Sequence, residues 1–202
     1  MKGRGVVTEE AGAFKFGIPD PDQSHLDLPY SYPNLWQRQK TTGPERLVLA
    51  PAARQVRLFT DLVARIPEPL GLLYVLLVPR GEGAAGRYEC KTLLGRRSLT
   101  EFLERFSAYF EGDGRHHLWV ASPGTTWGEH GQIIYDNHNL IYAYGPLSDF
   151  IAVAKNRGLS EGDVKIPCPH VHKYNAAFDR QAASLLNVYE WRHFPLPPDD
   201  DP

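Results

Sequence analysis

The chain has 202 residues, 42% of them hydrophobic and 23% charged, which fits one globular domain and excludes global disorder. A formal net charge of −2 with no stripe of Lys and Arg argues against nucleic-acid binding. Two cysteines are too few for a secreted disulfide framework, and residues 1–10 lack the apolar segment of a signal peptide. The longest apolar run, residues 70–78, is far shorter than the roughly 20 residues of a membrane helix. We therefore expect a cytoplasmic protein with free thiols and no membrane contact.

The N-terminal part of the chain, residues 1–44, is expected to form an irregular arm. Closely spaced prolines at Pro19 and Pro21, and the pair Gly43-Pro44, interrupt regular structure. The arm is nevertheless rich in aromatic residues, which are rare in disordered segments. Part of it is therefore expected to lie against the domain or against a partner.

The next elements follow from hydrophobic spacing. A short strand is expected at 47–49, and residues 52–66 have the spacing of an amphipathic helix that ends before Pro67. The apolar run 70–78 predicts a strand buried on both faces, followed by a strand at 87–93. The pattern predicts a helix over 98–110, with Ser98 and Glu101 forming a capping box.

The second half of the chain is expected to contain strands, a hairpin and two further helices. A strand at 115–122 precedes a hairpin of 132–135 and 140–144, and Pro146 then starts a helix that runs to about 157. Prolines keep 164–174 extended. The remaining expected elements are a helix over 175–186, a strand over 189–194 and an acidic disordered tail over 195–202. This order predicts a single α+β domain over 45–194, with a mainly antiparallel sheet and about four helices packed on it.

A metal site is one interpretation of the extended segment near residue 170. Alternate residues of an extended chain share a face, so Cys168, His170 and His172 are expected to point the same way. Cys and His are ligands for zinc, and a third ligand would come from His138 or from another side chain. The remaining choices for that ligand are Asp136, His130 and the His116-His117 pair. The alternative is that these histidines only bind backbone groups and that the protein holds no cofactor.

The hairpin tip Asp136-Asn137-His138-Asn139 also has two interpretations. Asp136 could orient His138 as a general base. Asp and Asn are also the residues that turn geometry requires, and this second interpretation explains more of the tip. No nucleophile elbow is present, and the Gly-rich segment 81–86 is not followed by a helix. The sequence therefore favours a protein without catalytic activity.

The aromatic residues of this region are candidates for a protein-binding surface, because Trp and Tyr supply much of interface energy. The candidate binding residues are Trp127, Tyr135, His138, Tyr142 and Tyr144. The hairpin over 133–145, whose Ile-Tyr-Ala-Tyr-Gly end leads into a helix, resembles small α+β immunity proteins of bacterial polymorphic-toxin systems, as does the Pro-His-x-His-x-Tyr stretch at 169–174. The resemblance covers residues 115–194, and the N-terminal arm is not part of it.

Three hypotheses follow. The first, which the resemblance implies, is a non-catalytic bacterial protein of the immunity or accessory type that binds a protein partner such as a toxin. The second is a metal-dependent hydrolase in which zinc is bound by His170 and His172 with His138 or Cys168. The third is a structural subunit of a larger complex.

Overall fold

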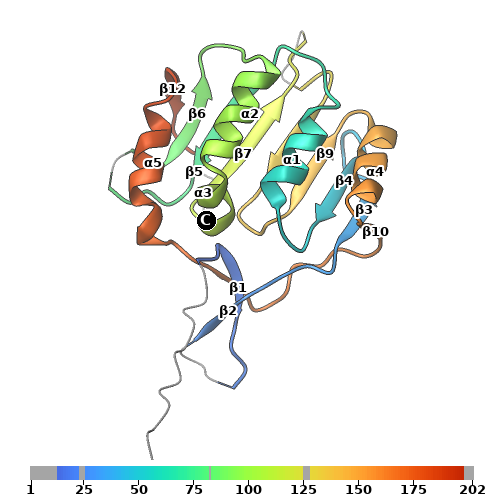
Figure 1. Ribbon diagram of the computed structural model, residues 1–202, viewed down its shortest axis with the longest axis vertical. Coiled ribbons are helices and arrows are strands. Elements are labelled where there is room, and N and C mark those ends of the chain that lie inside the picture. The colour runs from blue at the N-terminus through green and yellow to red at the C-terminus, as the bar shows by residue number, and fades with distance from the viewer. Residues whose placement is uncertain (1–12, 23–25, 82, 125–127, 198–202) are drawn as a thin grey trace, which may run out of the picture.

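The computed structural model describes residues 13–22, 26–81, 83–124 and 128–197, and every structural statement below refers to them. They form the expected α+β fold, with a large sheet, a small sheet and helices that cover one face of the large sheet (Figure 1). No helix in these ranges is long and apolar enough to cross a membrane. Cys90 and Cys168 are free thiols, as predicted.

The large sheet has nine strands in the order β10-β3-β4-β9-β8-β7-β5-β6-β12. Its strands are β3 (Leu35–Gln39), β4 (Arg46–Ala50), β5 (Gly71–Leu76), β6 (Gly86–Cys90), β7 (His116–Ala121), β8 (Gln132–Tyr135), β9 (Ile141–Tyr144), β10 (Ser160–Glu161) and β12 (Trp191–Phe194). All neighbouring strands are antiparallel except β10 and β3, which are parallel. The mainly antiparallel sheet predicted from the short connections is therefore confirmed.

Five α-helices lie on the face of the large sheet turned toward the viewer in Figure 1. They are α1 (Gln55–Val63), α2 (Arg96–Arg105), α3 (Ser107–Gly112), α4 (Leu147–Asn156) and α5 (Asp179–Leu186), with a short 3-10 turn, η1, at Ala176–Phe178. Alternate strand residues, such as Leu72 and Tyr74 of β5, point toward these helices and meet Phe59 of α1 in one apolar core. In the described ranges, the opposite face of the sheet carries no helix.

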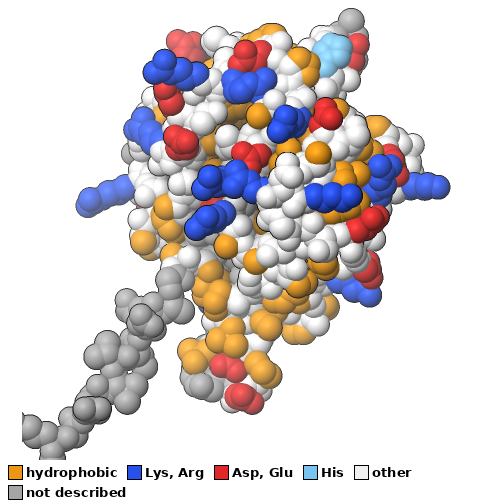
Figure 2. All heavy atoms as spheres, turned by 45° about the vertical axis from the view of Figure 1, so that its right-hand side comes forward, with side chains coloured by type: hydrophobic (Ala, Val, Ile, Leu, Met, Phe, Trp, Pro, Cys, Tyr) orange, Lys and Arg blue, Asp and Glu red, His pale blue; other side chains and the backbone are white. Residues whose placement is uncertain are grey.

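The small sheet has three antiparallel strands in the order β11-β1-β2: β11 (Val171–His172), β1 (Phe16–Pro19) and β2 (Asp27–Pro29). It lies below the large sheet in Figure 1, and hydrophobic side chains gather on this projecting part in Figure 2. A second apolar cluster connects the two sheets, in which Phe16 and Tyr32 pack with Val48, Ala50 and Leu140. This packing brings β11 to the β8–β9 hairpin tip.

The prediction of an irregular arm over 1–44 is wrong for the residues that the structure describes. This region contains β1, β2 and β3, and β3 belongs to the large sheet. The buried side chains of Phe16 and Trp36 provide the physical reason, since each fills a place in an apolar cluster. The prolines end β1 and β2 instead of preventing them, because a terminal strand position tolerates a missing N–H.

The predicted helix over 98–110 also differs in detail. It is divided into α2 and α3 at Phe106, and it begins at Arg96 with Gly95 at the N-cap. The prediction of a capping box is wrong, because the Ser98 hydroxyl instead lies 3.2 Å from the Tyr189 hydroxyl. A helix N-terminus needs acceptors for its free N–H groups, and the carboxylate of Glu68 accepts from the Arg96 amide instead.

The remaining elements agree with the sequence more closely. The strand expected at 47–49 is β4, and the hairpin is β8 with β9. The helices expected at 52–66, 146–157 and 175–186 are α1, α4 and η1 with α5. The closing strand is β12. Of the extended segment 164–174, only β11 pairs with another strand. Residues 198–202 of the predicted acidic tail lie outside the described ranges.

Candidate metal site

A tight turn between β8 and β9 presents the first histidine of the site. Asp136 Oδ1 accepts hydrogen bonds from the backbone N–H groups of His138 at 2.9 Å and Leu140 at 2.8 Å. Asn139 has a left-handed backbone, with φ of 64°, and its Oδ1 accepts from the Tyr135 hydroxyl at 2.7 Å. The predicted role of Asp and Asn in turn geometry is therefore seen directly, and the turn fixes His138 at the end of the hairpin.

The other two histidines come from the segment that pairs with β1. His172 lies opposite Phe16 in the register of β11 and β1. The Phe16 ring contacts all three imidazoles, with centroid distances of 5.3 Å to His138, 5.5 Å to His170 and 5.7 Å to His172. One buried aromatic ring thus forms the apolar floor of the histidine cluster.

The three imidazoles converge. Their ring centroids are 5.1 Å apart for His138 and His170, 4.7 Å for His138 and His172, and 5.3 Å for His170 and His172. One nitrogen of each ring lies within 4.8 Å of one nitrogen of each of the others. In the described part of the chain, no further His, Cys, Asp or Glu joins this group. Such a group of three imidazole nitrogens has the composition of a transition-metal site.

Two of the rings are oriented by oxygen acceptors. His138 Nδ1 lies 3.1 Å from Asp136 Oδ2, and His170 Nδ1 lies 3.0 Å from the Pro167 carbonyl oxygen. A nitrogen that faces an acceptor carries the proton of the neutral ring, so the lone pair is on the other nitrogen, Nε2. The same arrangement is found in metal sites, where a carboxylate or carbonyl fixes the tautomer of each ligating histidine.

The third ring, His172, has a buried nitrogen without a hydrogen-bond partner, Nδ1. Burial and the neighbouring His138 and His170 lower the pKa of His172 to about 4, against a smaller raising effect of a hydrogen bond to the Asn137 backbone. The ring is therefore neutral at pH 7. A neutral imidazole is the form that binds a metal ion.

Asp136 is ionised although it is buried. Burial raises its pKa, but the hydrogen bonds from the His138 ring and the Leu140 amide, with the nearby His117, outweigh this effect and hold the pKa below its ordinary value. The Tyr142 hydroxyl donates to Asp136 Oδ2 at 3.2 Å. The carboxylate therefore serves both the turn and the His138 ring, so the two interpretations of the hairpin tip are compatible.

The other predicted ligands lie elsewhere. Cys168 is exposed and outside the histidine group, because the regular alternation of β11 does not extend back to it. His116 is fully buried between the rings of Tyr74 and Tyr109, with centroid distances of 5.8 Å and 4.6 Å. Sequence reasoning missed Phe16, whose part in the site arises only from the pairing of β1 with β11.

The predicted protein-binding residues do not form one surface. Tyr135 is fully buried and cannot contact a partner, because its ring points into the core on the helix-covered side. Trp127 lies outside the described residues. Tyr142 and Tyr144 are half-buried on the face without helices. On that face the half-buried side chains of Leu73, Trp119, Ile134 and Tyr142 form a cross-strand row.

Comparison with known proteins gives no match: no family model, curated protein or solved structure is significantly similar to this chain.

Proposed function

We propose that this protein binds one divalent transition-metal ion through His138, His170 and His172, and that Zn²⁺ is the first ion to test. The observation that carries the proposal is the convergence of three imidazole nitrogens within 4.8 Å of one another. Tetrahedral zinc with Zn–N bonds of about 2.1 Å requires nitrogen separations of roughly 3.4 Å, which small side-chain rotations supply.

The buried Nδ1 of His172 favours a metal over a purely structural cluster. A buried polar atom without a partner costs about 1–3 kcal/mol, and His172 Nδ1 has none in the described part of the chain. If the cluster served only for packing, this cost would have no compensation. A cation held by the three lone pairs removes it.

The ligand number supports a reactive site. Structural zinc sites use four protein ligands, whereas catalytic sites use three and keep one position for water. His170 is the most exposed of the three histidines, so the remaining position opens toward solvent on its side. A zinc-bound water has a pKa of about 7 and is a nucleophile at neutral pH. We therefore favour the hypothesis of a metal-dependent hydrolase, while the immunity-type partner protein stays a prediction from the hairpin and its resemblance.

The test is a zinc titration of the full-length protein after removal of metal with a chelator. We expect one Zn²⁺ per chain by elemental analysis and by calorimetry. His172→Ala and His138→Ala should each weaken binding at least about 100-fold, because a two-ligand site cannot complete the coordination. His130→Ala is the matched control, since His130 is outside the histidine group.

Two results would contradict the proposal. One is a protein that takes up no stoichiometric Zn²⁺, Co²⁺ or Ni²⁺. The other is an equal loss of affinity in His130→Ala and His172→Ala, which would indicate nonspecific binding. Hydrolysis is tested next with an activated ester, comparing the zinc-loaded protein with the His172→Ala variant; equal rates would leave metal binding intact and reject the hydrolase assignment.

A further inference from the structure

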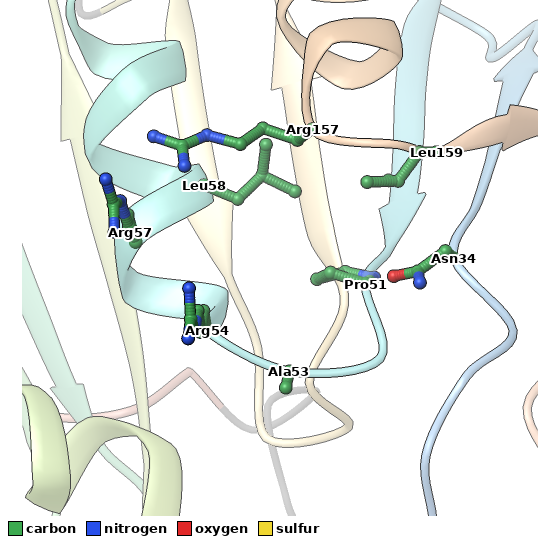
Figure 3. A pocket seen from close by; sticks show the side chains of 8 residues that line it. All are labelled: Asn34, Pro51, Ala53, Arg54, Arg57, Leu58, Arg157 and Leu159. Atoms are coloured by element: carbon green, nitrogen blue, oxygen red, sulfur yellow. The ribbon is translucent and has the colours of Figure 1, made fainter.

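A pocket between α1, α4 and the segment before α1 is lined by three arginines, Arg54, Arg57 and Arg157 (Figure 3). Every charged side chain that lines this pocket is an arginine. The other lining residues are Asn34, Pro51, Ala53, Leu58 and Leu159. Three guanidinium groups around one hollow make the local potential positive, which favours the binding of an anion.

The charges of this pocket are only partly compensated within the protein. Arg157 pairs with Asp61 of α1 through Nε and Nη2, and its Nη1 makes no hydrogen bond among the described residues. In the same ranges, Arg54 and Arg57 take part in no ion pair and no hydrogen bond through their side chains. Two full positive charges and the free edge of a third guanidinium therefore remain for a ligand.

The same three arginines also line an adjoining hollow, together with Asp61, Glu104 and Glu111. Among the described residues, only Asp61 forms an ion pair with one of these arginines, Arg157. The Glu111 carboxylate accepts a hydrogen bond from the Val56 amide at 2.8 Å, so it is engaged at the first turn of α1. Neither glutamate lies within ion-pair distance of Arg54 or Arg57, since no such pair occurs in the described part of the chain.

The backbone before α1 is held in an unusual conformation that orients the pocket. Arg54, at the N-cap of α1, has φ of 57° and ψ of 44°, a left-handed geometry that residues with a Cβ seldom adopt. Asn34, with φ of 57°, lines the same pocket, and its Oδ1 accepts from the Ala52 amide at 2.8 Å. In Figure 3, Arg157 reaches from the end of α4 toward α1, where Arg54 and Arg57 stand one turn apart.

We propose that this pocket binds a phosphate group. Guanidinium groups recognise tetrahedral oxyanions through paired N–H···O contacts, and three of them here approach one hollow from two helices. This site is independent of the histidine cluster: it uses no metal ligand and takes an anion rather than a cation.

The experiment measures thermal stabilisation of the full-length protein by inorganic phosphate at constant ionic strength, with chloride as the reference salt. A ligand that binds only the folded state raises the melting temperature in a saturable way. Arg57→Ala and Arg54→Gly should each weaken phosphate binding at least about tenfold, the effect of losing one charge-assisted contact. Arg97→Ala is the matched control, because Arg97 is an exposed arginine on α2 outside the pocket.

Arg54→Gly separates loss of binding from loss of folding. Glycine adopts the left-handed conformation without strain, so this variant should melt higher than the original protein in the absence of phosphate while it binds phosphate less well. The proposal is overturned if phosphate gives no shift beyond that of chloride, if both pocket variants bind phosphate as tightly as the original protein, or if Arg97→Ala loses as much affinity as they do.

Discussion

The two sheets of this protein are held in place by different kinds of contact. The large sheet rests on one apolar core, in which Phe59, Leu72 and Leu118 are fully buried. The small sheet has strands of only two to four residues, and its described contacts to the rest of the molecule include a small aromatic cluster, three histidines and the buried Lys15. Apolar burial stabilises the first arrangement without any ligand, whereas the second gains less from burial.

Both regions contain buried polar atoms without a hydrogen-bond partner. Three of those without a hydrogen-bond partner lie in or beside the small sheet: Lys15 Nζ, Tyr32 Oη and His172 Nδ1. Each such atom makes folding less favourable. In the small sheet one of these atoms, His172 Nδ1, belongs to the group of converging imidazoles, where a bound ion would offset its cost. Functional sites commonly give up stability in this way.

The largest expected effect concerns the apolar core of the large sheet. Phe59→Ala should lower the free energy of unfolding by about 3–5 kcal/mol, because it opens a cavity in the core beneath the large sheet. The matched change in the small sheet, Leu28→Ala, should cost less than about 0.5 kcal/mol, since Leu28 is 43% exposed. Urea denaturation measures both. Equal losses for the two variants would show that the small sheet contributes as much to stability as the core does.

Sequence patterns predicted most strands of the large sheet, but neither its strands β3 and β10 nor the strands β1 and β2 of the small sheet. The segment 70–78 and the hairpin at 132–144 have clear local signals, an apolar run between prolines and a turn of Asp and Asn. The strands β1 and β11 are too short for a period-2 pattern, and their pairing joins Phe16 to His172 from opposite ends of the chain. Such a contact depends on tertiary packing, which local spacing does not contain.

The same limit applies to the histidine cluster. Alternation along an extended chain correctly placed His170 and His172 together, because that geometry is local. The alternation does not continue to Cys168, which is exposed and outside the histidine group. The hairpin supplies His138 from a different sheet, so the sequence offered it only as one of several choices for a third ligand.

A smaller effect is expected from replacing Lys15, a buried charged residue beside the small sheet. Its ammonium group is fully buried, 3.5 Å from the centroid of the Tyr135 ring. Burial lowers the pKa of Lys15 to about 7, although the charges of Asp136, Glu111 and Asp113 act in the opposite direction. An unfolded lysine keeps its proton up to about pH 10.4, so between pH 7 and that value the unfolded chain binds more protons and stability rises with pH.

Lys15→Met should remove this dependence. In the presence of a chelator, the variant should be more stable than the original protein at pH 7 by about 3 kcal/mol, and the advantage should shrink as the pH rises to 9.5. Lys165→Met is the control, because Lys165 is exposed. Urea denaturation at a series of pH values is the measurement. A destabilised Lys15→Met variant, or a constant difference across the range, would show that the buried lysine is charged and well compensated.

The smallest expected effect distinguishes the three histidines from Asp136, the side chain that orients the His138 ring. Asp136→Asn removes the negative charge beside His138 Nδ1 but keeps an oxygen for the turn amides of His138 and Leu140. A carboxylate in this position usually contributes 10–100-fold to metal affinity, equivalent to about 1.4–2.7 kcal/mol. We expect zinc binding to weaken by this factor with stoichiometry unchanged, in contrast to the near-complete loss in His172→Ala. Asp163→Asn, which changes an exposed carboxylate, is the control. If Asp136→Asn binds zinc as tightly as the original protein while its melting temperature falls, the carboxylate serves the turn alone, and the cluster depends on its three imidazoles without support from a second layer of residues.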